Sequence, residues 1–150
     1  MPVRRLRVSN IMMTTVQQPA PRIRGVLASL RRPGFLPAWV ADLDRVIAPA
    51  GLELRKAGFG SPTFDRVRAG GLVAAIVVAD DGPTDALSQL RTIRSIDCAL
   101  PCWLIAERPP KQLLQIALSL SVRSVIPEPV DVTGLGRSLL DALVNLEKRN

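Results

Sequence analysis

The stretch Leu72–Ala79 reads LVAAIVVA and is followed directly by Asp80-Asp81-Gly82-Pro83. Every residue of the stretch is apolar, and the run is too short for most helices. A continuous apolar run of this length is typical of a central strand that is covered on both faces, as in a parallel sheet. The Asp-Asp-Gly-Pro sequence predicts a turn immediately after that strand.

Strand and helix patterns alternate on both sides of this central strand. The predicted elements before it are strands at 22–29 and 52–57, a helix at 36–47, and a short helix that Ser61 caps. The predicted elements after it are a helix through Ala86–Ile93, a strand at 102–106, a helix at 113–120, a strand at 122–126 and a helix at 135–146. The chain therefore contains five β-α units in succession.

Five β-α units predict an α/β fold in which helices cover both faces of a parallel sheet. Right-handed crossovers leave few topologies, and we expect a flavodoxin-like, doubly wound, five-stranded parallel sheet with strand order 2-1-3-4-5. Ligands of such sheets bind outside the carboxyl ends of the strands. Functional residues are therefore expected directly after strands one, three, four and five.

The composition excludes several classes of active site. The chain has no histidine, which excludes histidine-dependent triads, histidine general bases and histidine-ligated metals. Its two cysteines, Cys98 and Cys102, lack the C-x-x-C spacing of redox motifs and are too few for a metal site. The sequence has no glycine-rich phosphate loop and no apolar run of about 18 residues. We expect a cytoplasmic protein that is not an enzyme, has no membrane span and uses no metal or cofactor.

Positive charge is concentrated at the amino-terminal end of the chain. The net charge is +7, and no acidic residue precedes Asp42. The basic residues before that point are Arg4, Arg5, Arg7, Arg22, Arg24, Arg31 and Arg32. We interpret residues 1–21 as a flexible basic arm and residues 22–150 as one domain. An arginine-rich, acid-free start is also typical of mitochondrial presequences, and that alternative stays open.

Four segments of the domain resemble the receiver domain of response regulators, in the same order and at similar spacing. The segments are Ile76–Asp80, Asp85–Arg94, Leu100–Ala106 and Ser124–Pro129, which correspond to the third strand, the helix after it, the fourth strand and the fifth strand of a receiver. The resemblance covers about residues 22–146. It implies a receiver-like domain in which Asp80 stands at the position of the phospho-accepting aspartate.

The resemblance also implies that the residues that handle phosphate are missing. Phosphoryl transfer to a carboxylate needs a divalent cation and a positive side chain. Receivers hold the cation with an acidic pair after the first strand, and here that place falls around Leu27-Ala28-Ser29. Ala106 stands in place of a hydroxyl residue, and Glu128 stands in place of a lysine. We therefore expect Asp80 to be inactive, and the bond before Pro129 to be cis as it often is in receivers.

Asp81 lies beside Asp80 and completes this degenerate pocket. In one alternative, these two aspartates and Glu128 converge on Mg²⁺ or on a basic group of a partner. In the simpler interpretation, Asp80 is a carboxylate that begins a turn at the end of a strand. Because spacing alone does not make a metal site, we expect none.

The first functional hypothesis is a phosphorylation-independent pseudo-receiver that regulates signalling or transcription by protein-protein contact. Receivers signal through their fourth helix, fifth strand and fifth helix. Residues 113–122 carry no charge, so we expect one face of the fourth helix to contact a protein partner or a second copy in a C2 dimer. The expected surface contains Leu114, Leu118, Val125 and Leu139. The alternative is a helix that its own neighbours cover.

The second hypothesis is a nucleic-acid-associated regulator that uses the basic arm. The candidate phosphate contacts are Arg4, Arg5, Arg7, Arg22 and Arg24. The chain has no recognisable helix-turn-helix, zinc finger or RNA-recognition motif. Its few aromatic residues do not lie among these arginines, which argues against recognition by base stacking.

Overall fold

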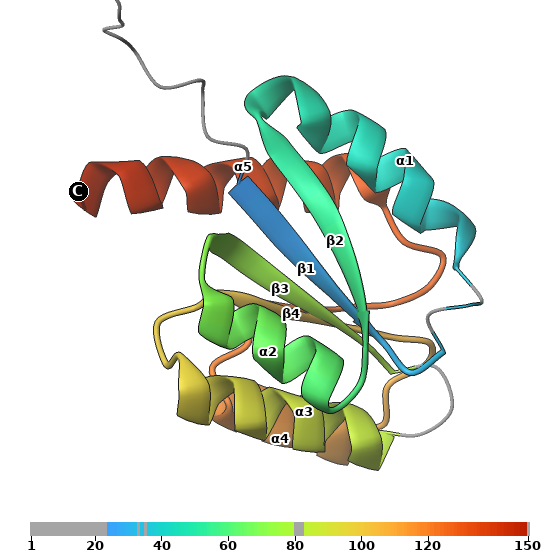
Figure 1. Ribbon diagram of the computed structural model, residues 1–150. Helices are drawn as coiled ribbons and strands as arrows, with labels where there is room; N and C mark the ends of the chain where they lie inside the picture. The colour runs from blue at the N-terminus through green and yellow to red at the C-terminus, as the bar shows by residue number, and fades with distance from the viewer. Residues whose placement is uncertain (1–23, 33, 35, 80–82, 150) are drawn as a thin grey trace, which may run out of the picture.

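The computed structural model describes residues 24–32, 34, 36–79 and 83–149, and strands alternate with helices throughout this part of the chain (Figure 1). The elements are β1 (Arg24–Leu30), α1 (Ala38–Ile47), the 3-10 turn η1 (Ala48–Ala50), β2 (Leu52–Gly58), α2 (Ser61–Ala69), β3 (Leu72–Ala79), α3 (Pro83–Ile96), β4 (Cys102–Ala106), α4 (Lys111–Ser119), β5 (Ser124–Ile126) and α5 (Val132–Arg149). Within the described residues we find no helical segment with the length and hydropathy of a membrane span.

The five strands form one sheet in the order β2-β1-β3-β4-β5, and all four neighbouring pairs are parallel. The predicted α/β fold, with its flavodoxin-like strand order, is therefore confirmed. β3 and β4 have the bounds that their apolar runs predicted. Both strands have a neighbour on each side and a helical layer on each face, so every position along them favours an apolar residue.

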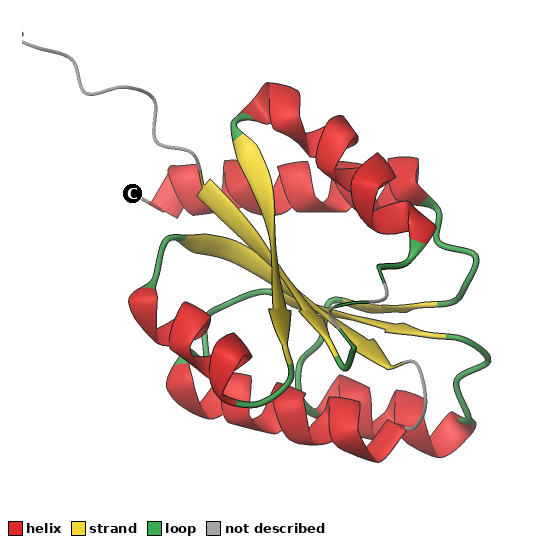
Figure 2. Ribbon diagram, turned by 45° about the vertical axis from the view of Figure 1, so that its right-hand side comes forward, coloured by secondary structure: helices red, strands yellow, loops and turns green. Residues whose placement is uncertain are grey.

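Helices cover both faces of the sheet. Figures 1 and 2 show α1 and α5 packed on one face, and α2, α3 and α4 packed on the other. Side chains of β1 alternate between the two layers, because Val26 and Ala28 face the α1–α5 side and Leu27 faces the opposite side. The two layers share no apolar side chains, and the sheet separates two hydrophobic clusters.

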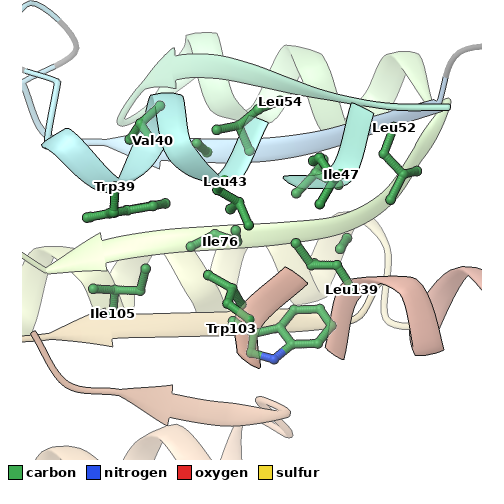
Figure 3. Close-up of a cluster of buried hydrophobic side chains, with 14 of the residues drawn as sticks. Trp39, Val40, Leu43, Ile47, Leu52, Leu54, Ile76, Trp103, Ile105 and Leu139 are labelled. Carbon is green, nitrogen blue, oxygen red and sulfur yellow. The ribbon is translucent and has the colours of Figure 1, made fainter. Parts of the chain in front are cut away.

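The cluster between the sheet and the α1–α5 layer contains the largest buried side chains (Figure 3). Trp39 and Leu43 from α1 point toward Ile76 of β3, and Trp103 of β4 and Leu139 of α5 close the cluster. Leu43, Ile76 and Leu139 are fully buried. Removal of any one of these side chains to alanine is expected to cost about 2–5 kcal/mol of unfolding free energy.

A glycine of α5 lies close to a side chain of α1. A Cβ atom added at Gly136 would lie 2.6 Å from Cγ1 of Val46 in α1. That distance is too short for two carbon atoms, so a larger residue at this position would require the Val46 side chain to move.

Two predicted boundaries were wrong for local reasons. Ser61 is the first residue of α2 rather than its cap, and Gly60 takes the cap position with a φ of +83° that favours glycine. The fifth strand begins at Ser124 rather than at residue 122. Val122 is buried in the same hydrophobic cluster as Leu113 and Ala117 of α4, so its apolar side chain belongs to the core without being part of a strand.

Candidate functional site at the carboxyl edge of the sheet

The carboxyl ends of four strands meet at one edge of the sheet. Leu30 at the end of β1 lies beside Val78 of β3, and Ala79 at the end of β3 lies beside Ala106 at the end of β4. β5 ends beside β4 at the same edge. The residues that follow these strands are therefore brought together, at the place where α/β sheets of this order bind ligands.

Asp80 and Asp81, which the sequence predicts at this edge after β3, lie outside the described residues. The alternative in which these two aspartates and Glu128 converge on a cation or a basic group therefore also lies outside the described residues.

The carboxyl edge also holds the two residues that are predicted to stand in place of a hydroxyl residue and a lysine. Ala106 is buried at the end of β4, and its methyl group can neither donate nor accept a hydrogen bond. Glu128 is exposed after β5, and within the described residues its carboxylate makes no hydrogen bond or ion pair. The Glu128–Pro129 bond is cis, as the sequence predicts.

The position expected for the metal-binding acidic pair was a few residues too early in the chain. Leu27, Ala28 and Ser29 lie inside β1 and are fully buried. The Ser29 hydroxyl is 2.7 Å from Oγ1 of Thr63, which itself donates a hydrogen bond of 2.7 Å to the carbonyl oxygen of Gly58. These groups join β1, β2 and α2 and serve the fold, because their hydrogen-bonding capacity is used internally.

Two arginines occupy the carboxyl edge where β1 ends. Since Leu30 lies beside Val78, the next residue, Arg31, is level with Ala79, and Arg32 follows it. Nη1 of Arg31 lies 3.3 Å from Oδ2 of Asp85 in the first turn of α3, and both side chains are substantially exposed. The two residues after β1 are therefore positively charged, whereas receivers carry carboxylates after this strand.

The described residues of this edge do not by themselves supply the ligands that hold the magnesium ion of a receiver. Mg²⁺ is held by carboxylate oxygens in near-octahedral geometry. Within the described residues, no group of three His, Cys, Asp or Glu side chains could hold a metal ion. A guanidinium group after β1 would also repel a divalent cation at that position.

No family model and no curated protein matches the sequence, but solved structures match the fold. The chain is similar to a response regulator receiver domain protein (CheY-like) from Methanospirillum hungatei JF-1, with 12% identity, a TM-score of 0.70, and coverage of 85% of this chain and 99% of that one. A two-component response regulator from Clostridium difficile matches with 11% identity, a TM-score of 0.67, and coverage of 82% and 98%.

The chain has the CheY-like receiver fold. A sensor protein from Polaromonas sp. JS666 has the same fold, with 19% identity, a TM-score of 0.64, and coverage of 83% of this chain and 98% of that one. At these identities the similarity establishes the fold alone. The chemistry of the carboxyl edge depends on this chain's own residues.

On this receiver fold, the expected interaction surface is only partly exposed. Leu118 of α4 is 66% exposed, Leu114 is 36% exposed, and Val125 of β5 is half-buried. Leu139 was wrongly assigned to this surface, because it is fully buried between α5 and the sheet. We call Leu114, Leu118 and Val125 the α4–β5 surface.

Most of the candidate nucleic-acid contacts lie outside the described residues. These are Arg4, Arg5, Arg7 and Arg22. Arg24 opens β1, and its Nη1 atom is buried without a hydrogen-bond partner among the described residues. Nucleic-acid binding by the arm stays a prediction.

Sequence reasoning missed a structural arginine at the opposite edge of the sheet. Arg94 of α3 donates hydrogen bonds of 2.7–3.0 Å to four main-chain carbonyl oxygens, those of Cys98, Leu100, Leu120 and Ser121. The bonds tie the loop before β4 to the turn before β5. No pattern in the sequence indicates them, because the carbonyls come together only when the strands pair.

The two cysteines have different environments. Cys98 is exposed, whereas Cys102 is fully buried at the start of β4. Burial raises the pKa of the Cys102 thiol to about 11, because the thiolate would lose its hydration. The neighbouring Arg94 opposes part of this rise in pKa. Cys102 is therefore a protonated core residue at neutral pH.

Proposed function

We propose that this chain is a signalling protein with a receiver fold that acts without phosphorylation, by contact with another protein. The observation that carries the proposal is the reversal of charge at the carboxyl edge. Arg31 and Arg32 follow β1, where receivers place metal-binding carboxylates, and Glu128 follows β5, where receivers place a lysine. Ala106 also offers no hydroxyl to a phosphoryl oxygen.

Each of these differences opposes phosphoryl transfer to Asp80. The reaction brings an anionic phosphate to a carboxylate, and it needs positive charge that is shared between a metal and a side chain. The two arginines exclude the metal, and the Glu128 carboxylate adds a negative charge on the side from which a lysine would neutralise the phosphate. Control would then come from the abundance of the protein or from partner binding.

Calorimetric titration with MgCl₂ tests whether the two arginines after β1 prevent the binding of Mg²⁺. We expect no specific heat of binding at millimolar Mg²⁺, in contrast to a variant that carries Arg31→Asp and Arg32→Asp, which restores two carboxylates after β1. The matched control is Arg66→Asp with Arg68→Asp on α2, which makes the same change of net charge away from this edge. Saturable Mg²⁺ binding by the unmodified chain would contradict the proposal.

The α4–β5 surface supports the proposal that the chain acts by contact with another protein. Leu118 is the most exposed large apolar residue among the described residues, and Leu114 lies one helical turn before it. β5 is also an edge strand, so one side of its backbone is available for pairing. A second copy of the chain related by a two-fold axis is the simplest partner for a surface of this kind.

Solution mass as a function of protein concentration tests this surface. We expect a dimer whose dissociation constant rises at least tenfold in Leu118→Glu, because a carboxylate would then be buried in an apolar contact. Leu36→Glu is the matched control, since Leu36 is 48% exposed and precedes α1, outside the three elements through which receivers signal. A strict monomer at high concentration, with no change in Leu118→Glu, would remove self-association.

A further inference from the structure

A groove of about 350 Å³ lies at the carboxyl edge beside the end of β1. It is formed by the end of β1, the loop between β2 and α2, and the first turns of α3. Its lining residues are Arg31, Phe59, Gly60, Asp85, Ser88 and Gln89, and we call it the Gln89 groove. Its volume is at the lower end of the range for small-molecule sites, which is roughly 300–1,000 Å³.

Gln89 gives this groove a fixed polar group with unused capacity. The side chain is only 9% exposed. Its Oε1 atom accepts a hydrogen bond of 3.0 Å from the main-chain N–H of Gly60, which fixes the orientation of the amide. Within the described residues, Nε2 makes no hydrogen bond. Nε2 is not one of the fully buried polar atoms that lack a partner, so it keeps contact with solvent and can donate to an acceptor in the groove.

The loop that faces Gln89 leaves space for that acceptor. Gly60 has a φ of +83°, which favours glycine, and a Cβ atom there would meet nothing within 4 Å. Phe59 is half-buried beside it and supplies an apolar wall. Ser88 is exposed on α3, and its hydroxyl makes no hydrogen bond within the described residues.

The charges of the groove restrict the ligand that it can take. Arg31 and Asp85 are its charged residues, and their side chains form the ion pair of 3.3 Å described above. A simple anion would add negative charge beside Asp85, and a simple cation would add positive charge beside Arg31. A ligand that carries both charges keeps the groove neutral and can replace the exposed ion pair with two hydrogen-bonded pairs.

We propose that the Gln89 groove binds a free α-amino acid. Its carboxylate would accept hydrogen bonds from Arg31, Ser88 and Nε2 of Gln89, and its ammonium group would face the carboxylate of Asp85. Phe59 would contact the side chain of the amino acid. The inference is independent of the proposed function, because it concerns binding by the chain alone and needs neither a partner nor Asp80.

The test is a titration of the full chain, labelled with ¹⁵N, with each of the common L-amino acids at millimolar concentration. We expect at least one of them to bind with a dissociation constant on the order of 1 mM or below and to shift the side-chain Nε2 resonances of Gln89. The N-acetylated and the amidated forms of the same amino acid each lack one charge. Each is expected to bind at least tenfold more weakly.

Three variants locate the ligand. Arg31→Gln is expected to weaken binding at least tenfold, and Ser88→Ala about threefold. Arg91→Gln is the matched control, because Arg91 is exposed on α3 outside the groove. Failure of every amino acid to shift the Gln89 resonances would overturn the proposal. Equal binding by a singly charged analogue, or binding that persists unchanged in Arg31→Gln, would overturn it as well.

Discussion

The two edges of the sheet use arginine in different ways. At the amino edge, Arg94 donates to four main-chain carbonyl oxygens and joins the loops before β4 and β5. At the carboxyl edge, Arg31 is 40% exposed and contacts Asp85, which is 54% exposed. An arginine bonded to main-chain oxygens holds the fold together, whereas one that faces an exposed carboxylate remains available to a ligand or a partner. We therefore expect the amino edge to govern stability and the carboxyl edge to govern function.

The largest expected difference between the two edges is in stability. Arg94→Met leaves four carbonyl groups without their donor, and we expect it to lower the free energy of unfolding by about 3 kcal/mol. Arg91→Met on the exposed side of the same helix is the control. Urea unfolding followed by tryptophan fluorescence measures both. A loss below about 1 kcal/mol in Arg94→Met would show that the amino edge is not held in this way.

The stability of the folded chain is expected to depend on pH through Cys102 at the amino edge. The pKa of Cys102 is raised to about 11 in the folded chain from 9.0, so the native state holds the thiol proton more tightly than the unfolded state does. The stability linked to this proton is complete below pH 9 and is lost as the pH rises through about 11. The loss is on the order of 2 kcal/mol. Cys102→Ala should not show this part of the loss, and parallel pH profiles for the two proteins would contradict the prediction.

The smallest expected effect on stability is at the carboxyl edge. Arg31→Met removes an exposed ion pair, and exposed ion pairs contribute about 0–1 kcal/mol. Urea unfolding should therefore place Arg31→Met within about 1 kcal/mol of the unmodified chain. A destabilisation as large as that of Arg94→Met would erase the difference between the edges.

Patterns of apolar residues predicted most of the fold. The run Leu72–Ala79 gave the bounds of β3, and strand-helix alternation gave the strand order, because right-handed crossovers leave few alternatives. Two boundaries were wrong where an apolar or capping residue had a different role. Val122 packs in the core outside any strand, and Ser61 lies inside the helix that it was expected to cap.

The candidate site was less predictable because it depends on register. The resemblance identified Ala106, Glu128 and the cis bond before Pro129. It missed Arg31, because the length of β1 is known only from its pairing with β3. It also placed Leu139 on a surface, although a fifth helix lined by apolar residues at helical spacing must bury some of them. Side-chain hydrogen bonds such as that of Gln89 have no sequence signal.

Exposure of the full chain to acetyl phosphate and Mg²⁺, with detection by intact mass spectrometry, most directly tests the proposal that the chain acts without phosphorylation. We expect the mass to remain that of the unmodified protein, because the described carboxyl edge offers arginine, alanine and glutamate where the reaction needs a metal site, a hydroxyl and an ammonium group. Appearance of one phosphoryl group that depends on Mg²⁺ and disappears in Asp80→Asn would contradict the account.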